Sequence, residues 1–584
     1  MDVPLRKPPR LKQKRKLWAG VFLALLLLGS GLVTAGLWLF NALPSSERVA
    51  PFDGRKNVIL FQGEVQEESF LLEDGEISVP FSFIQKYIDP AIFWDEPTRS
   101  VIVTTKDKVL QMESEQLVAY LNKTPVNLQV PVKEVAGVRY VPLTPLNKIY
   151  PYQVKHITES GVLLVEKNDY AVQQGKVLSA DEDQPEPQPL RIGASVKKAA
   201  VGELAPDEVV DLLQEEAGWY RVQSAAGLLG FLPKEAVRLS QIRKTAVKTA
   251  EMAQETTAWK PLGGKINLAW EQVVNRNPKL ADIPQMPGLN VVSPTWFELV
   301  DNQGTLGNKA DPAYVKWAHG KGYKVWGLVS NGFNPDFTTA VLRDYRLRSN
   351  MIAQILQYAN LYDLDGINLD FENVYIEDKA RLVQFVRELT PYLHEQGLTV
   401  SMDVTIKSTS DQWSRFYDRA ALAQTVDYIA VMTYDEYWAS SPVAGSVASL
   451  PWTEKGLQGI LEEVPAKKVL LGVPFYTRLW TEVKQADGTV KVTSKALSME
   501  RAEAWVKERK LTPQPDAKTG QLFVSYTDPT DGATYKMWLE DSGSMAKRIE
   551  LVKKYDLAGV AAWRRGFEQP KIWTTIAEGL AKKE

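Results

Sequence analysis

The chain has 584 residues, of which 45% are hydrophobic and 24% are charged, and its formal net charge is -2. This composition is typical of a folded globular protein, and the length allows several domains. The near-zero net charge gives no electrostatic reason to expect nucleic acid as a partner. There is no cysteine, and the three histidines, His156, His319 and His394, are far apart in sequence. Disulfides are therefore excluded, and a histidine-based metal site is not expected.

The N-terminus combines a basic segment with a long apolar one. Residues 1–16 are rich in lysine and arginine, and residues 17–40, LWAGVFLALLLLGSGLVTAGLWLF, carry no charge. The apolar run is long enough to cross a bilayer as a helix, and the basic flank places residues 1–16 in the cytoplasm. We therefore predict a single-pass transmembrane helix over 17–40 that holds the protein in the cell membrane, with the rest of the chain extracellular. A cleaved signal peptide with a site at 33–35 is the alternative, disfavoured because LWLF continues the apolar run.

Residues 57–168 alternate strand-like runs with turns, among them VIVTT, GVRYVPL and GVLLVEK. Through VPFSFIQKYIDPAIFWDEPTRSVIV and RYVPLTPLNKIY, this segment resembles the N-terminal domain of copper amine oxidases. The resemblance implies a small β-rich stalk domain. The segment holds one histidine and no cysteine, so a structural or wall-contacting role is expected rather than copper binding.

The acidic, proline-rich stretch SADEDQPEPQP, residues 179–189, indicates an extended linker. Residues 191–240 follow, and their GWYRVQSAAGLLGFLPKEAV resembles bacterial Src-homology-3-like domains. The resemblance leaves two roles open, binding to the cell wall and acting as a spacer. Residues 242–260 have a helical pattern and are expected to lead into the last domain.

Residues 262–584 alternate apolar strand-like runs with amphipathic stretches, the pattern of a parallel sheet with helical crossovers. Eight such runs predict an α/β fold, a (β/α)8 TIM barrel with its active site at the carboxyl ends of the strands, preceded by the transmembrane helix and two small β-rich domains. The gap before the last run predicts an insertion at about 477–544 that forms a wall of the cleft. The runs are KINLAW, LNVVSPTWF, YKVWGLVSN, DGINLDFE, LTVSMDVT, VDYIAVMTYD, KVLLGVPFY and LAGVAAWRRGFE.

The fourth run, LDGINLDFENV at residues 364–374, alternates apolar and polar residues. Successive side chains of a strand point to opposite faces, so Asn368, Asp370 and Glu372 share the face that looks into a barrel. Glu372 comes last and reaches the catalytic rim. The charge of Asp370 makes ionisation of Glu372 harder and raises its pKa, as a general acid requires. A buried polar network that only fixes strand register is the alternative.

This run is one of a set of motifs. DGINLDFE resembles the signature Asp-Gly-x-Asp-x-Asp-x-Glu of family 18 glycoside hydrolases, the chitinase family, which carries it on the fourth strand. MTYD, residues 432–435, closes the sixth run, GVPFYTRLW follows the seventh, and Trp563 ends the eighth in GVAAWRRGFE, as in that family. The resemblance covers residues 265–584 and is greatest to the spore and cell-wall N-acetylglucosaminidases.

The resemblance implies a role for each matching residue. Glu372 would protonate the glycosidic oxygen, and Asp370 would accept a hydrogen bond from the acetamido N–H of the substrate. Tyr434 would bind the acetamido carbonyl with Asp435 near it, and Trp563 would form the floor of the sugar subsite. In this family the N-acetyl group of the substrate attacks the anomeric carbon, so a retaining reaction needs no second carboxylate as nucleophile. No metal or cofactor is implied.

Position 368 departs from the signature, which has aspartate where this chain has Asn368. In the family that aspartate helps to hold the next one and to balance its charge. An amide can hydrogen-bond Asp370 but cannot share a proton with it. We expect Asn368 to belong to the substrate-binding set and the acid function of Glu372 to persist.

Other residues near the expected site carry weaker signals. Arg478 is placed in the substrate-binding set, although packing within the inserted wall is equally compatible, as it is for Trp480. Asp403, near the end of the fifth run, either points into the cleft or caps the following turn. Trp296 and Trp538 are expected in the core or the wall rather than at sugar subsites.

Together these features predict a membrane-anchored extracellular glycosidase. Its substrate would be a glycan with β-1,4-linked N-acetylglucosamine, and peptidoglycan is favoured because a tethered enzyme reaches only nearby polymer. A chitinase or chitooligosaccharide hydrolase is one alternative. A non-catalytic glycan-binding wall protein is another, disfavoured because such proteins usually lose the acid, whereas Glu372 is present.

Overall fold

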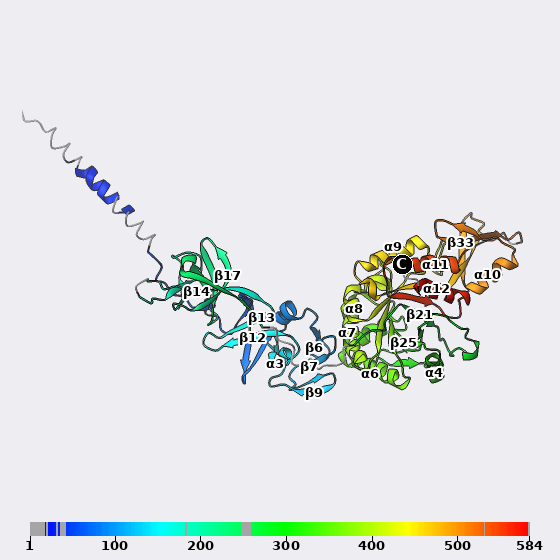
Figure 1. Cartoon of the computed structure of the whole chain (residues 1–584), viewed down its shortest axis with the longest axis horizontal. Helices are drawn as coiled ribbons and strands as arrows, with labels where there is room; N and C mark the ends of the chain where they lie inside the picture. The colour runs from blue at the N-terminus through cyan, green and yellow to red at the C-terminus, as the bar shows by residue number, and fades with distance from the viewer. Residues whose placement is uncertain are drawn as a thin grey trace, which may run out of the picture. The chain divides into compact units, whose positions relative to one another are not determined.

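The computed structural model divides into two compact units, Met1–Ile88 with Glu134–Gln254, and Asp89–Lys133 with Glu255–Glu584 (Figure 1). The second unit contains the predicted barrel. Each unit is built on its own sheets. The structure describes residues 18, 21–30, 33–34, 43–181, 184–246, 259–530 and 532–581.

The predicted transmembrane helix is not found in the described part of the chain, where no helix is both long and apolar enough to cross a membrane. Of the span 17–40, residues 18, 21–30 and 33–34 are described, and they are helical. The remainder of that span and the basic tail 1–16 lie outside the described residues.

The first unit holds three sheets, with strand orders β12-β13-β1-β2, β10-β11-β4-β3 and β16-β15-β19-β18-β17-β14-β20. Its short helical segments lie before β1 and after β4, β11 and β19. The bounds of its elements are η1 Pro51–Gly54, β1 Val58–Phe61, β2 Glu64–Ser69, β3 Leu71–Glu73, β4 Glu76–Pro80, α2 Phe81–Phe83, η2 Ile84–Ile88, β10 Lys133–Val135, β11 Val138–Pro142, α3 Leu143–Asn147, β12 Tyr152–Ile157, β13 Val162–Lys167, β14 Ala171–Val177, β15 Gln188–Arg191, β16 Ala200–Leu204, β17 Val209–Glu216, β18 Trp219–Ser224, β19 Leu229–Pro233, η3 Lys234–Ala236 and β20 Val237–Lys244.

The seven-stranded sheet begins earlier than the expected start of the Src-homology-3-like domain at residue 191. Strand β14 pairs with β17 and with β20, so it is an internal strand of this sheet. The acidic stretch 179–189 therefore connects two strands of one sheet, β14 and β15, rather than two separate domains. The helix expected at 242–260 is wrong at its start, because residues 242–244 end β20; residues 247–258 lie outside the described part.

Ion pairs join the seven-stranded sheet to the amine-oxidase-like strands within the first unit. Arg243 on β20 lies 2.7 Å from Glu166 on β13 and 2.5 Å from Asp211 on β17. Arg221 on β18 pairs with Glu64 on β2. These ion pairs therefore join the seven-stranded sheet to the part of the amine-oxidase-like segment that lies in the first unit.

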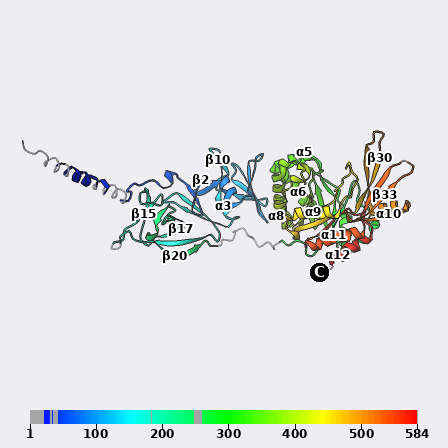
Figure 2. The same cartoon turned by 90° about the horizontal axis from the view of Figure 1, so that it is seen from above.

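The second unit contains a closed barrel of eight parallel strands, in the order β22-β21-β35-β29-β28-β27-β26-β25, with β22 and β25 also paired. Helices surround the strands (Figure 2). All eight strands were predicted from the sequence. The barrel strands are β21 Ile266–Glu271, β22 Val291–Pro294, β25 Lys324–Ser330, β26 Gly366–Asp370, β27 Thr399–Thr405, β28 Tyr428–Met432, β29 Val469–Pro474 and β35 Gly559–Trp563. The other elements are η4 Leu280–Asp282, β23 Phe297–Leu299, β24 Leu306–Asn308, α4 Pro312–Gly320, α5 Pro335–Arg343, α6 Tyr345–Leu361, η5 Ile376–Asp378, α7 Lys379–Glu395, η6 Asp411–Arg415, α8 Arg419–Thr425, α9 Leu450–Leu461, η7 Ala466–Lys468, α11 Ser542–Lys554 and α12 Lys571–Ala581.

The predicted insertion between the seventh and eighth barrel strands is present as a small domain with its own sheet, β31-β30-β34-β33-β32. One helix covers it, and a compact apolar cluster lies between the two. Its elements are β30 Tyr476–Lys484, β31 Val490–Ser498, α10 Met499–Glu508, β32 Gln514–Asp516, β33 Gln521–Thr527 and β34 Thr534–Leu539.

Strand β26 shows how the barrel separates its two cores. Ile367 and Leu369 are fully buried in the core between strands and helices. Asn368 faces the interior and is equally buried. Gly366 begins the strand because a Cβ there would lie 2.7 Å from a side-chain atom of Trp326, which fills the barrel interior. The predicted alternation is therefore confirmed in the buried pattern of the strand.

A sheet from the predicted stalk segment belongs to the second unit. Strands β5 Phe93–Asp95, β6 Ser100–Thr104, β7 Val109–Glu113, β8 Val118–Leu121 and β9 Thr124–Asn127 form it. Ile102 and Val109 join the main core of the barrel. The expected domain 57–168 is thus divided between the two units, because apolar packing draws its middle part onto the barrel helices.

A buried ion cluster fixes this sheet to the barrel. Arg348 on α6 lies 2.9 Å from Asp95 on β5 and 2.9 Å from Glu388 on α7. All three side chains are at most 1% exposed. Removing one member of a buried cluster of one cation and two anions destabilises the fold, because the remaining charges stay buried, out of contact with water and without their partner.

We expect Arg348→Met to destabilise the second unit by about 3–5 kcal/mol, because Asp95 and Glu388 would remain buried without a cation. Arg346→Met on the same helix is the matched control, since Arg346 forms an exposed pair with Asp344 at 2.8 Å and such pairs contribute about 1 kcal/mol or less. Urea denaturation of the full chain, followed by tryptophan fluorescence, measures both. Equal losses for the two variants would contradict the role of the buried cluster.

Candidate active site

Glu372 stands two residues beyond the end of β26, at the carboxyl end of the barrel. Its backbone is held on both sides by one buried amide: the Glu372 N–H donates to Asn331 Oδ1 at 3.1 Å, and Asn331 Nδ2 donates to the Glu372 carbonyl at 2.7 Å. The hydroxyl of Tyr417 donates to the carbonyl of Phe371 at 2.8 Å. These contacts fix the direction in which the carboxyl group leaves the strand.

The surroundings of Glu372 favour its protonated form. Burial, the carboxylate of Asp370 and then that of Asp435 raise the pKa of Glu372 from 4.5 to about 8. Burial also raises the pKa of Asp370 to about 7, and its Oδ1 is a buried atom without a hydrogen-bond partner. Glu372 therefore carries a proton at neutral pH that it can donate, which is the condition for a general acid.

Asn368 lies one layer below Asp370, and every hydrogen-bonding position of its side-chain amide has a partner. Its Oδ1 accepts from Trp270 Nε1 at 2.8 Å and from Ser293 Oγ at 3.1 Å. Its Nδ2 donates to Ser401 Oγ at 3.0 Å and to Asp403 Oδ1 at 2.8 Å. Although an amide at this position can hydrogen-bond Asp370, all four of its hydrogen-bonding positions are used by other partners. The same saturation leaves Asn368 no group with which to contact a substrate.

Tyr434 and Asp435 follow β28 and lie near the carboxyl groups of Asp370 and Glu372. Burial and the carboxylates of Asp403, Asp370 and Glu372 raise the pKa of Tyr434 well above its ordinary value, with Tyr476 contributing. The ring of Tyr434 lies edge to face with that of Tyr476, with centroids 6.3 Å apart. The phenol is therefore a hydrogen-bond donor at any physiological pH.

The inserted domain completes this side of the site. The Tyr476 hydroxyl donates to Asp435 Oδ1 at 2.6 Å, and Arg478 Nη2 lies 3.5 Å from the same oxygen. Both residues belong to β30. Tyr476 was not singled out from the sequence as a site residue, although it stands inside the quoted motif GVPFYTRLW.

Trp563 ends β35 and lies half-buried against the interior core. Its ring is tilted against that of Trp270 at a centroid distance of 6.1 Å. It packs in the same small cluster as Tyr434 and Tyr476. The structure thus brings six of the predicted residues, Asp370, Glu372, Tyr434, Asp435, Arg478 and Trp563, to the carboxyl ends of the strands and leaves Asn368 beneath them.

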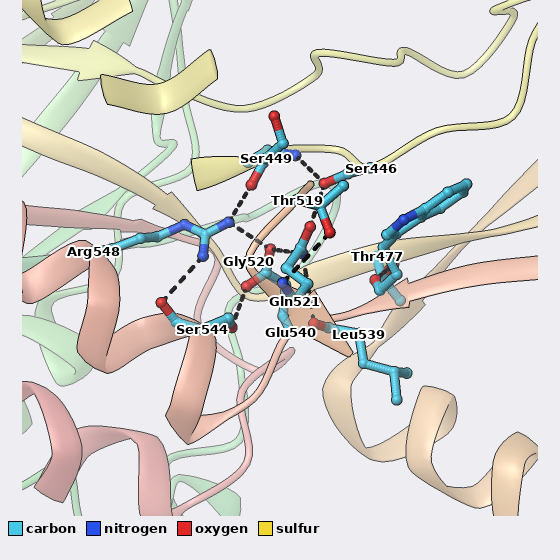
Figure 3. Close-up of polar contacts among 12 residues, drawn as sticks. Ser446, Ser449, Thr477, Thr519, Gly520, Gln521, Leu539, Glu540, Ser544 and Arg548 are labelled. Atoms are coloured by element: carbon cyan, nitrogen blue, oxygen red, sulfur yellow. Dashed lines mark hydrogen bonds and ion pairs between the residues drawn. The ribbon is translucent and has the colours of Figure 1, made fainter. Parts of the chain in front are cut away.

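A buried polar network holds the loop that follows Asp435 to the inserted domain (Figure 3). Ser446 of this loop donates to the Gln521 side chain, whose amide donates to Glu540 Oε1 at 2.8 Å. Arg548 on α11 pairs with Glu540 at 2.8 Å, with both side chains 1% exposed. Ser544 donates to the other Glu540 oxygen at 2.7 Å. Because the two charged members, Arg548 and Glu540, pair with each other, this network holds the loop without an unpaired charge.

Trp296 and Trp538 pack in the core and the wall as expected from the sequence, and Trp480, whose role was left open, packs in the wall. Trp296 is fully buried in the main core, and Trp480 is fully buried, with its Nε1 donating to the Gly445 carbonyl at 2.8 Å. Trp538 lies in the wall, where it donates to Asp516 at 2.9 Å. Asp403 is 2% exposed and points into the barrel interior toward Asn368 rather than capping the next turn.

The raised pKa of Glu372 predicts a pH-dependent stability. The fold favours the protonated acid, so its contribution is complete below the ordinary pKa of 4.5 and is lost as pH rises toward about 8. Glu372→Gln removes this loss, and we expect the variant to gain more than about 1 kcal/mol on wild type between pH 5 and pH 8, since one pKa unit corresponds to about 1.4 kcal/mol. Urea denaturation at the two pH values measures the change. The exposed Glu377→Gln is the control; a gain no larger than that of the control would refute the burial argument.

Comparison with protein families matches three parts of the chain. Residues 299–568 match the model for glycosyl hydrolases family 18, residues 61–165 match the copper amine oxidase N-terminal domain, and residues 184–238 match the bacterial SH3 domain. The first match contains the carboxyl ends of the barrel strands described above, except those of β21 and β22.

Curated relatives resemble the barrel part. The uncharacterized glycosylase YvbX of Bacillus subtilis is 29% identical over 302 residues, which cover 50% of this chain and 85% of that protein. The cortical fragment-lytic enzyme of Bacillus subtilis is 26% identical over 257 residues, which cover 44% of this chain and 58% of that protein. Among solved structures, the spore cortex-lytic enzyme SleL of Bacillus megaterium is 22% identical with a TM-score of 0.49, covering 55% of this chain and 76% of that one.

The motifs on β26, β28 and β35, the barrel that carries them and the family match all identify the same class of protein. Over residues 299–568 the C-terminal barrel matches glycosyl hydrolases family 18, and the relatives of this barrel support a glycoside hydrolase activity.

Proposed function

We propose that the protein hydrolyses β-1,4 bonds of an N-acetylglucosamine-containing glycan, with Glu372 as the general acid and retention of configuration. The observation that carries this proposal is the position of Glu372, half-buried beyond the end of β26 beside Asp370, where desolvation and the neighbouring carboxylate raise its pKa. Desolvation and a neighbouring carboxylate raise its pKa as acid catalysis near neutral pH requires.

The proposed reaction uses the acetamido group of the substrate as nucleophile. Glu372 gives its proton to the glycosidic oxygen while the acetamido oxygen bonds to the anomeric carbon, and the glycosidic bond breaks. The ring that forms carries a positive charge, which the Asp370 carboxylate stabilises while it accepts a hydrogen bond from the acetamido N–H. Tyr434 donates its O–H to the acetamido oxygen. Water then attacks the anomeric carbon, the bond between that carbon and the acetamido oxygen breaks to restore the acetamido group, and Glu372 takes up a proton from the water.

The site offers aromatic surface for sugar rings around this centre. Trp563 is half-buried beside Tyr434, the position that a sugar platform requires. Phe333, Trp413 and Trp438 are 44%, 46% and 54% exposed in the segments that follow β25, β27 and β28. Exposed rings at the carboxyl ends of neighbouring strands supply faces on which pyranose rings can stack.

Peptidoglycan is the proposed polymer. Two of the curated relatives bear names that refer to cortical fragment lysis and to sporulation. The Src-homology-3-like part precedes the barrel in the sequence and is joined by ion pairs to the amine-oxidase-like strands of the first unit, which suits a stalk. Chitin and its oligomers contain the same N-acetylglucosamine unit and are the competing substrates.

We expect the full-length protein to release N-acetylglucosamine reducing ends from purified peptidoglycan, and Glu372→Gln to lower that rate by about 10²–10⁴-fold, the usual contribution of a general acid. Mass spectrometry of the reduced products identifies the new ends. The exposed Glu377→Gln should keep the wild-type rate. Cleavage of chitin oligomers but not peptidoglycan would transfer the proposal to the alternative substrate; binding without cleavage of either would make the barrel a glycan-binding module.

We further propose that the segment 17–40 anchors the enzyme in the cell membrane with residues 1–16 in the cytoplasm. The charge asymmetry and length of the apolar run support this. The described stem that follows is already attached to the first unit, because Ser45 N–H donates to the Val196 carbonyl at 2.8 Å and Val49 N–H to the Ala200 carbonyl at 3.0 Å. The anchor would then hold the seven-stranded sheet close to the membrane.

Deleting residues 1–42 tests the anchor, since the stem contacts remain. We expect the full chain to stay with the membrane fraction after alkaline extraction and to be degraded by protease added outside the cell. A chain expressed without residues 1–42 should be soluble. A full-length product that is recovered from the medium with a new N-terminus near residue 36 would instead establish a cleaved signal peptide.

A further inference from the structure

Asp403 on β27 stands beside Asp370 inside the barrel. Strands β26 and β27 are parallel, with Asn368 opposite Ser401 and Leu369 opposite Met402. The next step of this register places Asp370 opposite Asp403. Both residues alternate onto the interior face with Asn368 and Ser401, and neighbouring strands are about 4.8 Å apart. The two carboxyl groups are therefore neighbours at the same level of the barrel.

The orientation of Asn368 determines how Asp403 is held. Trp270 and Ser293 both donate to Asn368 Oδ1, so its NH₂ group must face Ser401 and Asp403. The resulting hydrogen bond to Asp403 Oδ1 is 2.8 Å long. Asn368 thus acts as a fixed donor to Asp403, a carboxyl group that is 2% exposed.

The titratable groups around Asp403 and Asp370 are another carboxyl group and two phenols. The charge of Glu372 raises the pKa of Asp403, and the charge of Asp403 raises the pKa of the phenols of Tyr417 and Tyr434. Within the described part of the chain, no lysine or arginine forms an ion pair with either aspartate. Two adjacent carboxylates without a cation in a buried site cannot both be ionised at modest cost, so they titrate as a pair.

We propose that Asp370 and Asp403 share one proton, and that Asp403 thereby supplies from β27 the carboxyl group that the family signature places at position 368. The inference rests on the proposed function for its catalytic meaning. When the ring formed by the acetamido group of the substrate becomes positively charged, the proton leaves an Asp370 oxygen and binds an Asp403 oxygen. The pair keeps a charge of -1 throughout, and the negative charge lies on Asp370, next to the ring. Asp403 is a positioning residue, because it acts through Asp370.

Moving the carboxyl group between the strands tests the proposal. We expect Asp403→Asn to lower kcat by about 10–100-fold with a small change in KM and to shift the pH profile of kcat/KM. The double variant Asn368→Asp/Asp403→Asn restores a carboxyl neighbour from β26, and it should recover most of the rate and the wild-type profile. Asn368→Asp alone adds a third carboxyl group and should lose activity as pH rises. Asp363→Asn, a 93% exposed side chain, is the control.

A second readout does not depend on catalysis. The slope of unfolding free energy against pH counts the protons that the fold holds. Between pH 5 and pH 8, Asp403→Asn should hold one proton fewer than wild type, and the double variant should hold it again. The proposal fails if the stability slope and the pH profile of Asp403→Asn equal those of wild type. It also fails if Asp403→Asn loses activity and the double variant recovers neither the rate nor the pH profile. In both cases Asp403 is only a packing residue. If the slopes behave as expected but wild type cuts no glycan, the pair stands and the proposed function fails. Should Asp403→Asn not fold, the double variant still decides, since its slope must match that of wild type.

Discussion

The site depends on burying carboxyl groups that form no ion pair with a lysine or arginine in the described part of the chain. Asp370, Glu372 and Asp403 lie at the end of the barrel interior, and burial is the largest cause of the raised pKa of each. A carboxyl group that is kept from water and from lysine or arginine holds its proton near neutral pH. The fold thereby stabilises the protonated form of Glu372, and for the same reason its free energy of unfolding decreases as pH rises.

The remaining structure keeps these groups in place. The apolar residues of β26 anchor the strand in the outer core, and Trp270 and Trp326 fill the interior beneath the site. Asn331 and Tyr417, from the segments that follow β25 and β27, hold the backbone at Glu372 and Phe371. Because the supporting groups are buried amides and phenols, they orient the acid without adding a positive charge that would lower its pKa.

Local sequence patterns predicted the parts of this arrangement that depend on one strand. The alternation in LDGINLDFENV correctly predicted that Asn368 faces the interior, and apolar runs predicted all eight strands. The partner of Asn368 was not predictable, since Asp403 meets it through the register between β26 and β27, which no local pattern encodes. For the same reason the sequence placed residues 89–133 in the stalk domain, whereas Asp95, Ile102 and Val109 pack with the barrel unit.

The inserted domain connects distant sequence to the same chemistry. Tyr476 and Arg478 on β30 bind the carboxylate of Asp435, while Gln521 on β33 holds the loop that follows it. Asp435 in turn raises the pKa of Glu372. A change in the insertion that frees Asp435 would therefore act on the acid through charge rather than through contact. The insertion can reach this chemistry because the strands on either side of it, β29 and β35, are parallel neighbours in the barrel and both end at the site.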